Sequence, residues 1–200
     1  MNNLIIVSGP SGSGKSSLIR MLRRDFPEIG FSVSHTTRPQ GPKDTEGVDY
    51  HFIDRPTFLT MVEQGAFIEW AEVYGHLYGT SFTEIERCSQ RYAWVMLDVD
   101  VVGAQNLMNH YPKALSVMIV PPSLEDLADR IRKRTGRADD NLDLRLARAR
   151  NELREFDRYT YLVVNENLGH AYEQFKIIFL AQHQLSWRFS EVIRMLLSEE

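Results

Sequence analysis

The chain has 200 residues, of which 43% are hydrophobic, and its 23 Lys and Arg against 27 Asp and Glu give a net charge of −4. This acidic balance argues against a general nucleic-acid binder, and the length suits one α/β domain with a small inserted subdomain. No apolar run approaches the roughly 20 residues that span a bilayer, and the chain opens without a signal-peptide pattern. The single cysteine, Cys88, cannot form an internal disulfide, so we expect a cytoplasmic protein in a reducing compartment.

A glycine-rich stretch lies between an apolar run and a helical pattern near the start of the chain. Residues 4–7 are all apolar, as in a buried parallel strand, and Leu18, Met21 and Leu22 recur at helical spacing until Pro27. The stretch between them fits the phosphate-binding pattern G-x-x-x-x-G-K-S/T. Its members are Gly9, Pro10, Ser11, Gly12, Ser13, Gly14, Lys15 and Ser16.

In such a loop, glycines allow successive backbone N–H groups to point inward at phosphate oxygens. Lys15 would reach the β- and γ-phosphates of a nucleotide, and the Ser16 hydroxyl would ligate Mg²⁺. A helix that begins near Lys15 also directs its positive dipole end toward the anion. The stretch therefore predicts a nucleotide site, and a glycine-rich turn without a ligand is the alternative.

A strand-rich insert with turns of its own follows the first helix. Strand-like runs cover residues 31–34, 48–53 and 67–74, and helix-like runs open at Arg55 and near Phe82 after residues 78–81. The loop at residues 35–47 is polar, so its side chains are not expected to contribute to a hydrophobic core. These patterns predict a small subdomain inserted into the main fold.

Two acidic residues follow the buried-strand pattern at residues 93–98. In a doubly wound sheet, ligands bind at the carboxyl ends of the strands, where Asp98 and Asp100 would lie. A carboxylate there suits a second contact to Mg²⁺, usually through water. The alternative for Asp100 is the N-cap of a helix over residues 101–110. A further strand is expected at residues 115–120.

Positive charge is concentrated in residues 130–154, which hold nine Lys and Arg against four Asp and Glu. A capping-box-like sequence at Ser123 opens one helix, with Arg130 on its exposed side, and a second helix covers about residues 142–156. The polar connection between these two arginine-bearing helices is typical of a lid. Spacing alone leaves an arginine-lined phosphate site and a solvated helix with i,i+4 pairs equally open.

The end of the chain adds one strand and further helical patterns. Residues 161–165 predict the last strand, and residues 171–185 predict an amphipathic helix. Apolar residues then continue to the end, where they would pack on the domain or on a second subunit; the sequence leaves this choice open. The order of elements predicts an α/β fold, a doubly wound parallel sheet with a strand-rich insert and an arginine-rich helical lid.

Several stretches together resemble the guanylate kinase family. After the phosphate loop come Ser34-His35-Thr36-Thr37-Arg38-Pro39, Gly47-Val48-Asp49-Tyr50-His51-Phe52, Tyr78-Gly79-Thr80-Ser81, Leu97-Asp98-Val99-Asp100, Pro121-Pro122-Ser123 and Val163-Val164-Asn165. The resemblance spans residues 3–182 and implies a P-loop fold. The implied parts are a core of residues 3–31, 92–128 and 157–182, a GMP-binding insert of residues 32–91, a lid of residues 129–156 and a C-terminal helical extension of residues 183–200.

The resemblance implies an enzyme that transfers the γ-phosphoryl group of ATP to GMP or dGMP, giving ADP and GDP, with Mg²⁺. Such an activity serves purine nucleotide metabolism. The implied partners are these nucleotides, with neither nucleic acid nor a membrane, and the oligomeric state is left open.

The resemblance also implies roles for individual residues. ATP would be bound by Gly9, Pro10, Ser11, Gly12, Ser13, Gly14, Lys15, Ser16, Ser17, Arg130, Arg134 and Asn165. GMP would be bound by Ser34, Arg38, Tyr50, Glu69, Tyr78, Thr80, Asp98, Asp100 and Arg145. The catalytic groups around the transferring phosphoryl would be Lys15, Arg38, Arg134 and Arg145, and the metal ligands would be Ser16 and Asp98.

Physical reasons accompany these roles. One guanidinium fork and several hydroxyls suit a phosphate dianion. The Glu69 carboxylate would accept hydrogen bonds from the guanine N1–H and exocyclic amine, a donor pattern that adenine lacks, so a base without it would leave the charge unpaired. From the residues alone, Glu69 would be an outward strand position and Tyr50 a core position.

The sequence departs from the family pattern in the insert and in the lid. Gly41 stands where the family has a second phosphate-binding arginine, and Lys43 is the expected substitute, with weaker GMP binding because lysine offers a point charge instead of a fork. In the lid, the usual R-G-T-D-S is Arg134-Thr135-Gly136-Arg137-Ala138, and a common arginine is replaced by Leu144.

Two alternatives to an active guanylate kinase remain. One is a catalytically weak, guanylate-kinase-like binding module, which the intact Lys15 and Ser16 disfavour. The other is a related P-loop kinase for another small phosphorylated acceptor, which the change at Gly41 favours.

Overall fold

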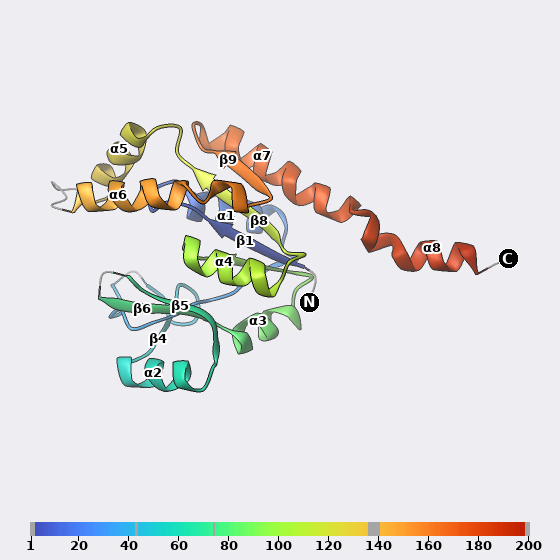
Figure 1. The fold of residues 1–200 in the computed structure, drawn as a ribbon, viewed down its shortest axis with the longest axis horizontal. Coiled ribbons are helices and arrows are strands. Elements are labelled where there is room, and N and C mark those ends of the chain that lie inside the picture. The colour runs from blue at the N-terminus through green and yellow to red at the C-terminus, as the bar shows by residue number, and fades with distance from the viewer. Residues whose placement is uncertain (1–2, 43, 74, 136–140, 199–200) are drawn as a thin grey trace.

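The computed structural model describes residues 3–42, 44–73, 75–135 and 141–198, with only the backbone for 134 and 135. Five strands form a parallel sheet in the order β2-β7-β1-β8-β9 (Figure 1). They are β1 (Leu4–Ser8), β2 (Ile29–Phe31), β7 (Trp94–Asp98), β8 (Leu115–Val120) and β9 (Tyr161–Val164). Every residue of β1 and β8 is buried, which explains why these runs are apolar with so little alternation.

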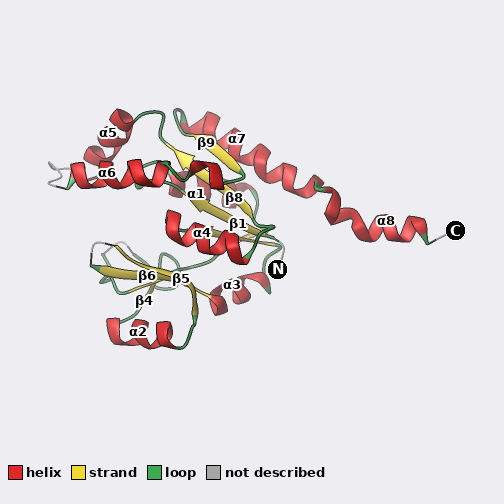
Figure 2. Ribbon diagram, in the orientation of Figure 1, coloured by secondary structure: helices red, strands yellow, loops and turns green. Residues whose placement is uncertain are grey.

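Helices cover both faces of this sheet (Figure 2). On one face lie α1 (Lys15–Asp25) and α7 (Leu168–Ala181), and on the other lie α3 (Phe82–Ser89) and α4 (Val101–His110). Along β1, Ile5 and Val7 belong to the first core cluster, whereas Leu4 and Ile6 belong to the second. The strand alternation thus divides one apolar run between two cores. The structure confirms the expected doubly wound parallel sheet.

A second sheet of four strands, in the order β4-β3-β6-β5, forms the insert. Its strands are β3 (His35–Thr36), β4 (His51–Phe52), β5 (Phe67–Val73) and β6 (His76–Ser81). The helix α2 (Arg55–Glu63) covers the side that faces away from α4 (Figure 2), where the Phe58 and Phe67 rings stack with centroids 4.4 Å apart. β5 contacts α4, so the insert rests on the main domain.

The strand expected at residues 31–34 is wrong beyond Phe31. Residues 32–34 form a link between the two sheets, because the Ser32 N–H donates to Met96 O of the main sheet and the Ser34 carbonyl accepts from His51 N–H of the insert. Each end of the link is therefore paired with a different sheet.

Two other expected elements of the insert change. The strand expected at residues 48–53 shortens to β4, and residues 78–81, expected as the lead into a helix, belong to β6. In β6, an added Cβ at Gly79 would lie 2.9 Å from the Phe67 ring and 3.0 Å from the Phe58 ring, so glycine here allows close packing. A strand with such a glycine carries a weak strand pattern in its sequence.

The two arginine-bearing helices are α5 (Leu124–Thr135) and α6 (Leu142–Leu153), and they pack together around a small apolar cluster that includes Ile131 and Ala149. The Ser123 hydroxyl accepts the Asp126 N–H at 3.0 Å, which confirms the expected helix start. α6 ends before the expected residue 156, and a 3-10 turn, η1 (Phe156–Arg158), follows it. Residues 136–140 lie outside the described part of the chain.

The chain continues into a helical extension that leads away from the sheet (Figure 1). After α7 come η2 (Gln182–Gln184), η3 (Ser186–Phe189) and α8 (Ser190–Leu197). Every residue of α8 is exposed, so of the two alternatives left open, packing on the domain does not hold for the apolar side chains of α8, and packing on a second subunit stays a prediction. Within the described ranges, no helix is both long and apolar enough to cross a membrane.

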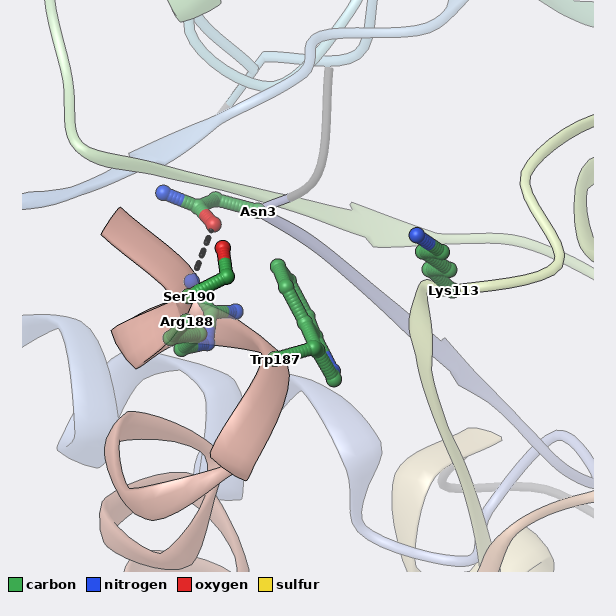
Figure 3. Close-up of a pocket in the computed structure, with 5 residues that line it drawn as sticks. All are labelled: Asn3, Lys113, Trp187, Arg188 and Ser190. Carbon is green, nitrogen blue, oxygen red and sulfur yellow. Dashed lines mark hydrogen bonds between the residues drawn. The ribbon is translucent and has the colours of Figure 1, made fainter. Parts of the chain in front are cut away.

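Arg188 anchors this extension at the amino ends of the main strands. Its guanidinium lies 4.6 Å from the Trp94 ring centroid and 4.5 Å from that of Trp187, and it donates to Asn3 Oδ1 at 2.6 Å. Figure 3 shows the Trp187 ring between Arg188 and Lys113, in a pocket that Asn3 also lines. Because Asn3 precedes β1 and the phosphate loop follows it, this pocket lies at the opposite end of the sheet from the loop.

Replacing Arg188 by alanine is expected to loosen the extension. The change removes a hydrogen bond and two cation–π contacts, so the free energy of unfolding should fall by about 1–2 kcal/mol. The melting temperature should fall by roughly 3–6 °C for a chain of this size, as measured by scanning calorimetry. The control is Arg194→Ala on the exposed α8; equal shifts in the two variants would contradict the anchoring role.

Candidate active site

The phosphate loop joins β1 to α1 through two close backbone approaches. An added Cβ at Gly9, where φ is +133°, would lie 2.1 Å from Ile119 O. At Gly14, where φ is +96°, it would lie 2.1 Å from Asn165 Nδ2. Both the dihedral and the space therefore favour glycine at these positions. The loop is pressed against the neighbouring strand β8 and against the end of β9, with the N-terminus of α1 open toward it.

The Ser13 carbonyl of the loop receives hydrogen bonds from two distant residues. Asn165, directly after β9, donates from Nδ2 at 2.7 Å, and Arg130 of α5 donates from Nη1 at 3.5 Å. Arg130 also donates to Asn165 O at 2.7 Å. Arg130 is therefore half-buried against the loop, and its expected exposed position is wrong. Both residues lie at the loop, and their contacts to ATP stay a prediction.

Lys15 lies at the start of α1 and folds back onto its own loop. Its Nζ donates to Gly9 O at 2.7 Å and to Pro10 O at 3.4 Å. Asp98 lies nearby because it pairs with Val7 across the β1–β7 register. Burial raises the pKa of the Asp98 carboxyl above its ordinary value, and the charge of Lys15 opposes this rise. The loop lysine and the strand-end carboxylate thus share one electrostatic site.

Ser16 and Asp98 are the expected metal ligands. Ser16 is exposed in the first turn of α1, and Asp98 is half-buried at the end of β7. Among the described residues, no group of three or more His, Cys, Asp or Glu side chains is placed to hold a metal ion. A hydroxyl and a single carboxylate, completed by phosphate oxygens and water, are the donor set that Mg²⁺ takes in such sites.

Arg38, Tyr50 and Tyr78 gather on the insert. The Arg38 guanidinium lies 5.3 Å from the Tyr50 ring centroid, and the Tyr50 and Tyr78 centroids are 5.7 Å apart. Burial raises the pKa of the Tyr50 hydroxyl; the nearby Tyr78 and Asp98 raise it further, and Arg38 lowers it. The cluster therefore lies within electrostatic range of Asp98 at the end of β7. Ser34 lies just before β3 of the same sheet, where its carbonyl accepts the His51 N–H of β4.

The Arg38 guanidinium is paired with an acidic residue. Asp44 Oδ2 lies 2.8 Å from Arg38 Nη1 and accepts the Gly41 N–H at 2.7 Å. The hydrogen bond and charge of Arg38 hold the pKa of the Asp44 carboxyl below its usual range. The neighbouring Lys43, expected to replace the missing arginine, lies outside the described residues.

Glu69 of β5 is a buried carboxylate, only 8% exposed, opposite Thr80 of β6. Burial raises its pKa to about 7; Asp100 also raises it, and the Thr80 hydroxyl and N–H lower it. The α4 backbone touches the carboxylate, because an added Cβ at Gly103 would lie 2.6 Å from Glu69 Oε2. The interpretation of Glu69 as an outward strand residue is therefore wrong.

Asp100 links this carboxylate to α6. Its Oδ1 accepts the Gly103 N–H at 2.8 Å, which confirms the N-cap of α4, and its Oδ2 lies 3.2 Å from Arg148 Nη2 on α6. Arg148 was missed in the sequence, where the only signal was its i,i+4 spacing to Glu152. Asp44 was missed as well, because no local pattern pairs it with Arg38.

The structure thus brings the expected residues into three neighbouring groups. The loop group contains Gly9 to Ser17 with Arg130, Asn165 and Asp98; the insert group contains Arg38, Tyr50 and Tyr78 beside Ser34; the carboxylate group contains Glu69, Thr80 and Asp100. Arg145 is half-buried on α6, and the side chain of Arg134 lies outside the described part, as does Arg137.

Replacing Glu69 by glutamine is expected to stabilise the fold in a pH-dependent way. The pKa of Glu69 rises from 4.5 to about 7 on folding, so above pH 7 its buried, ionised carboxylate lowers the free energy of unfolding. This loss of stability becomes smaller as the pH falls toward 4.5. The gain should reach up to about 3 kcal/mol at pH 8 and shrink toward pH 5, as measured by urea unfolding. Glu72→Gln, at an exposed position of the same strand, is the control; a pH-independent gain at Glu69 would contradict the burial penalty.

Comparisons with known proteins agree with this arrangement. The guanylate kinase family model matches residues 1–182. A guanylate kinase of Legionella pneumophila (strain Paris) is 44% identical over 179 residues, covering 90% of this chain and 86% of that protein. One of Pseudomonas fluorescens (strain Pf0-1) is 38% identical over 198 residues, with 97% and 96% covered. The crystal structure of guanylate kinase from Anaplasma phagocytophilum superposes with a TM-score of 0.72 at 29% identity, covering 92% of this chain and 88% of that one. The chain belongs to the guanylate kinase family.

Proposed function

We propose that this chain transfers the γ-phosphoryl group of ATP to GMP or dGMP, giving ADP and GDP, in the purine nucleotide metabolism of the cytoplasm. The observation that carries the proposal is Glu69, a buried carboxylate that pairs directly with no cation among the described residues. A guanine offers it two donors, N1–H and the exocyclic amine, and an adenine would leave its charge unpaired. Ionised Glu69 is therefore energetically unfavourable until such a base binds.

The donor nucleotide is bound at the phosphate loop. Backbone N–H groups and the N-terminus of α1 stabilise the phosphate charge, and Lys15 exchanges Gly9 O for a phosphate oxygen. Asn165 and Arg130 act from behind the loop, where their bonds to Ser13 O keep its backbone in the binding conformation. Because the backbone N–H groups of the loop are already positioned, less reorganisation is needed during phosphoryl transfer.

The acceptor phosphate is bound by the Arg38 fork with the Tyr50 and Tyr78 hydroxyls. Arg38 exchanges Asp44 for the phosphate when the acceptor binds. The insert rests on α4 of the domain that carries the phosphate loop, so acceptor and donor would be bound on one framework, and in-line transfer depends on that positioning. Arg145 and Arg134 complete the charge neutralisation from the lid.

Mg²⁺ would be held by Ser16 and Asp98. The fit rests on Asp98, whose desolvated carboxylate has a raised pKa and would be stabilised in its ionised form by a bound cation. The bound ion would neutralise charge on the β- and γ-phosphate oxygens. Lys15 supplies the protein's own positive charge at the same place.

A coupled assay of ADP production with Mg·ATP tests the proposal. Wild type should turn over GMP and dGMP in preference to AMP and UMP, and Lys15→Ala should lower kcat by at least about 100-fold because it removes a charge that stabilises the transferring group. A preference for AMP would overturn the guanine assignment. GMP binding in calorimetry without turnover would establish a binding module instead.

Replacing Asp44 by asparagine is expected to strengthen acceptor binding. The change releases the Arg38 guanidinium while the amide oxygen still accepts the Gly41 N–H. Because the ion pair is partly exposed, KM for GMP should fall about two- to five-fold, with KM for ATP unchanged. Asp49→Asn, which alters an exposed carboxylate of the same loop bonded to Thr45 N–H, is the control. An unchanged KM for GMP would show that Asp44 does not compete with the phosphate.

A further inference from the structure

Arg148 of α6 bridges two carboxylates that belong to different parts of the protein. Its Nε lies 2.8 Å from Glu152 Oε1 on its own helix, and its Nη2 lies 3.2 Å from Asp100 Oδ2 at the start of α4. The Glu152 bond is an ordinary i,i+4 pair. The Asp100 bond crosses from the lid helix to the main domain.

Asp100 is bonded on both carboxylate oxygens, and its position affects Glu69. Oδ1 fixes the Gly103 N–H, and the Gly103 backbone in turn packs against Glu69 Oε2. Its charge also opposes ionisation of Glu69. Asp100 and Glu152 share Arg148, which among the described groups is the cation that pairs with Asp100. An unbroken set of contacts thus runs from Arg148 to the Glu69 carboxylate.

We propose that Arg148 is a positioning residue for guanine: it holds Asp100 against α4 and offsets its charge, so that Asp100 and Glu69 together accept the donors of the base. The proposal rests on the function proposed above and assigns a role to a residue of the lid helix. Because Arg148 lies on α6, which also carries Arg145, recognition of the acceptor base is coupled to the position of the helix that serves the phosphoryl group.

The bridge adds little to stability. The Arg148 and Asp100 side chains are 38% and 23% exposed, and partly exposed ion pairs contribute little to folding. The Arg148→Gln variant should therefore fold, and its kinetic effects should report on positioning.

The experiment compares wild type with Arg148→Gln, Arg148→Lys and the control Arg150→Gln, an exposed arginine on the same helix. GMP affinity is measured by calorimetry without ATP, and kcat and KM are measured for GMP, AMP and ATP. In Arg148→Gln, the Kd and KM for GMP should rise about 5–10-fold, the effect of losing one charged hydrogen bond. The KM for ATP and the use of AMP should be unchanged, Arg148→Lys should recover part of the loss, and Arg150→Gln should match wild type.

A double-mutant cycle with Asp100→Asn shows whether Arg148 acts through Asp100. The effect of Arg148→Gln on GMP affinity should disappear in the Asp100→Asn background. Unchanged GMP affinity in folded Arg148→Gln, an equal loss for ATP and GMP, or full additivity in the cycle would each overturn the proposal. If wild type itself prefers AMP, the proposed function fails; if wild type uses GMP and Arg148→Gln does too with the same KM, only this inference fails.

Discussion

Three distant parts of the chain meet at the Ser13 carbonyl. The phosphate loop supplies the carbonyl, the end of β9 supplies the Asn165 amide and α5 supplies Arg130. A loop rich in glycine has many backbone conformations available, and these bonds, with the close approach of Gly9 to Ile119 O, select one of them. Arg130 lies in the middle of α5, so this helix is attached to the phosphate loop through its side chain.

The charged groups of the site are either desolvated or already paired with other groups of the protein. Glu69 and Asp98 both have raised pKa values because they are desolvated, and Arg38 and Lys15 are bonded to Asp44 and to loop carbonyls. Under the proposed function, nucleotides would supply new partners: donors for Glu69 and phosphates for Arg38 and Lys15. Groups that reduce the stability of the free protein would thus be stabilised when a ligand binds, which is a general property of binding sites.

The centre of the main sheet was predictable because β7, β1 and β8 are buried on both faces, so they are apolar runs whose ends fall close to where the sequence indicated. The two-residue strands β3 and β4 are too short to show any alternation. Local patterns also failed for Glu69 and Arg130, since burial of Glu69 is created by α4 packing on β5 and Arg130 is drawn in by Asn165 O. The roles of Glu69 and Tyr50 came from the family resemblance, whereas Arg148 and Asp44 depend on contacts between segments that no pattern relates.

The bond from Arg188 to Asn3 places two segments far apart in sequence beside each other, at the amino ends of the strands. The carboxyl ends, where the phosphate loop lies, are on the other side of the sheet. A linker joining the chain near residues 3 and 188 would therefore close it into a ring without crossing the nucleotide site. A tether attached to a surface through α8 would likewise leave the carboxyl ends of the strands open to solution. The extension and the phosphate loop therefore lie at opposite ends of the sheet.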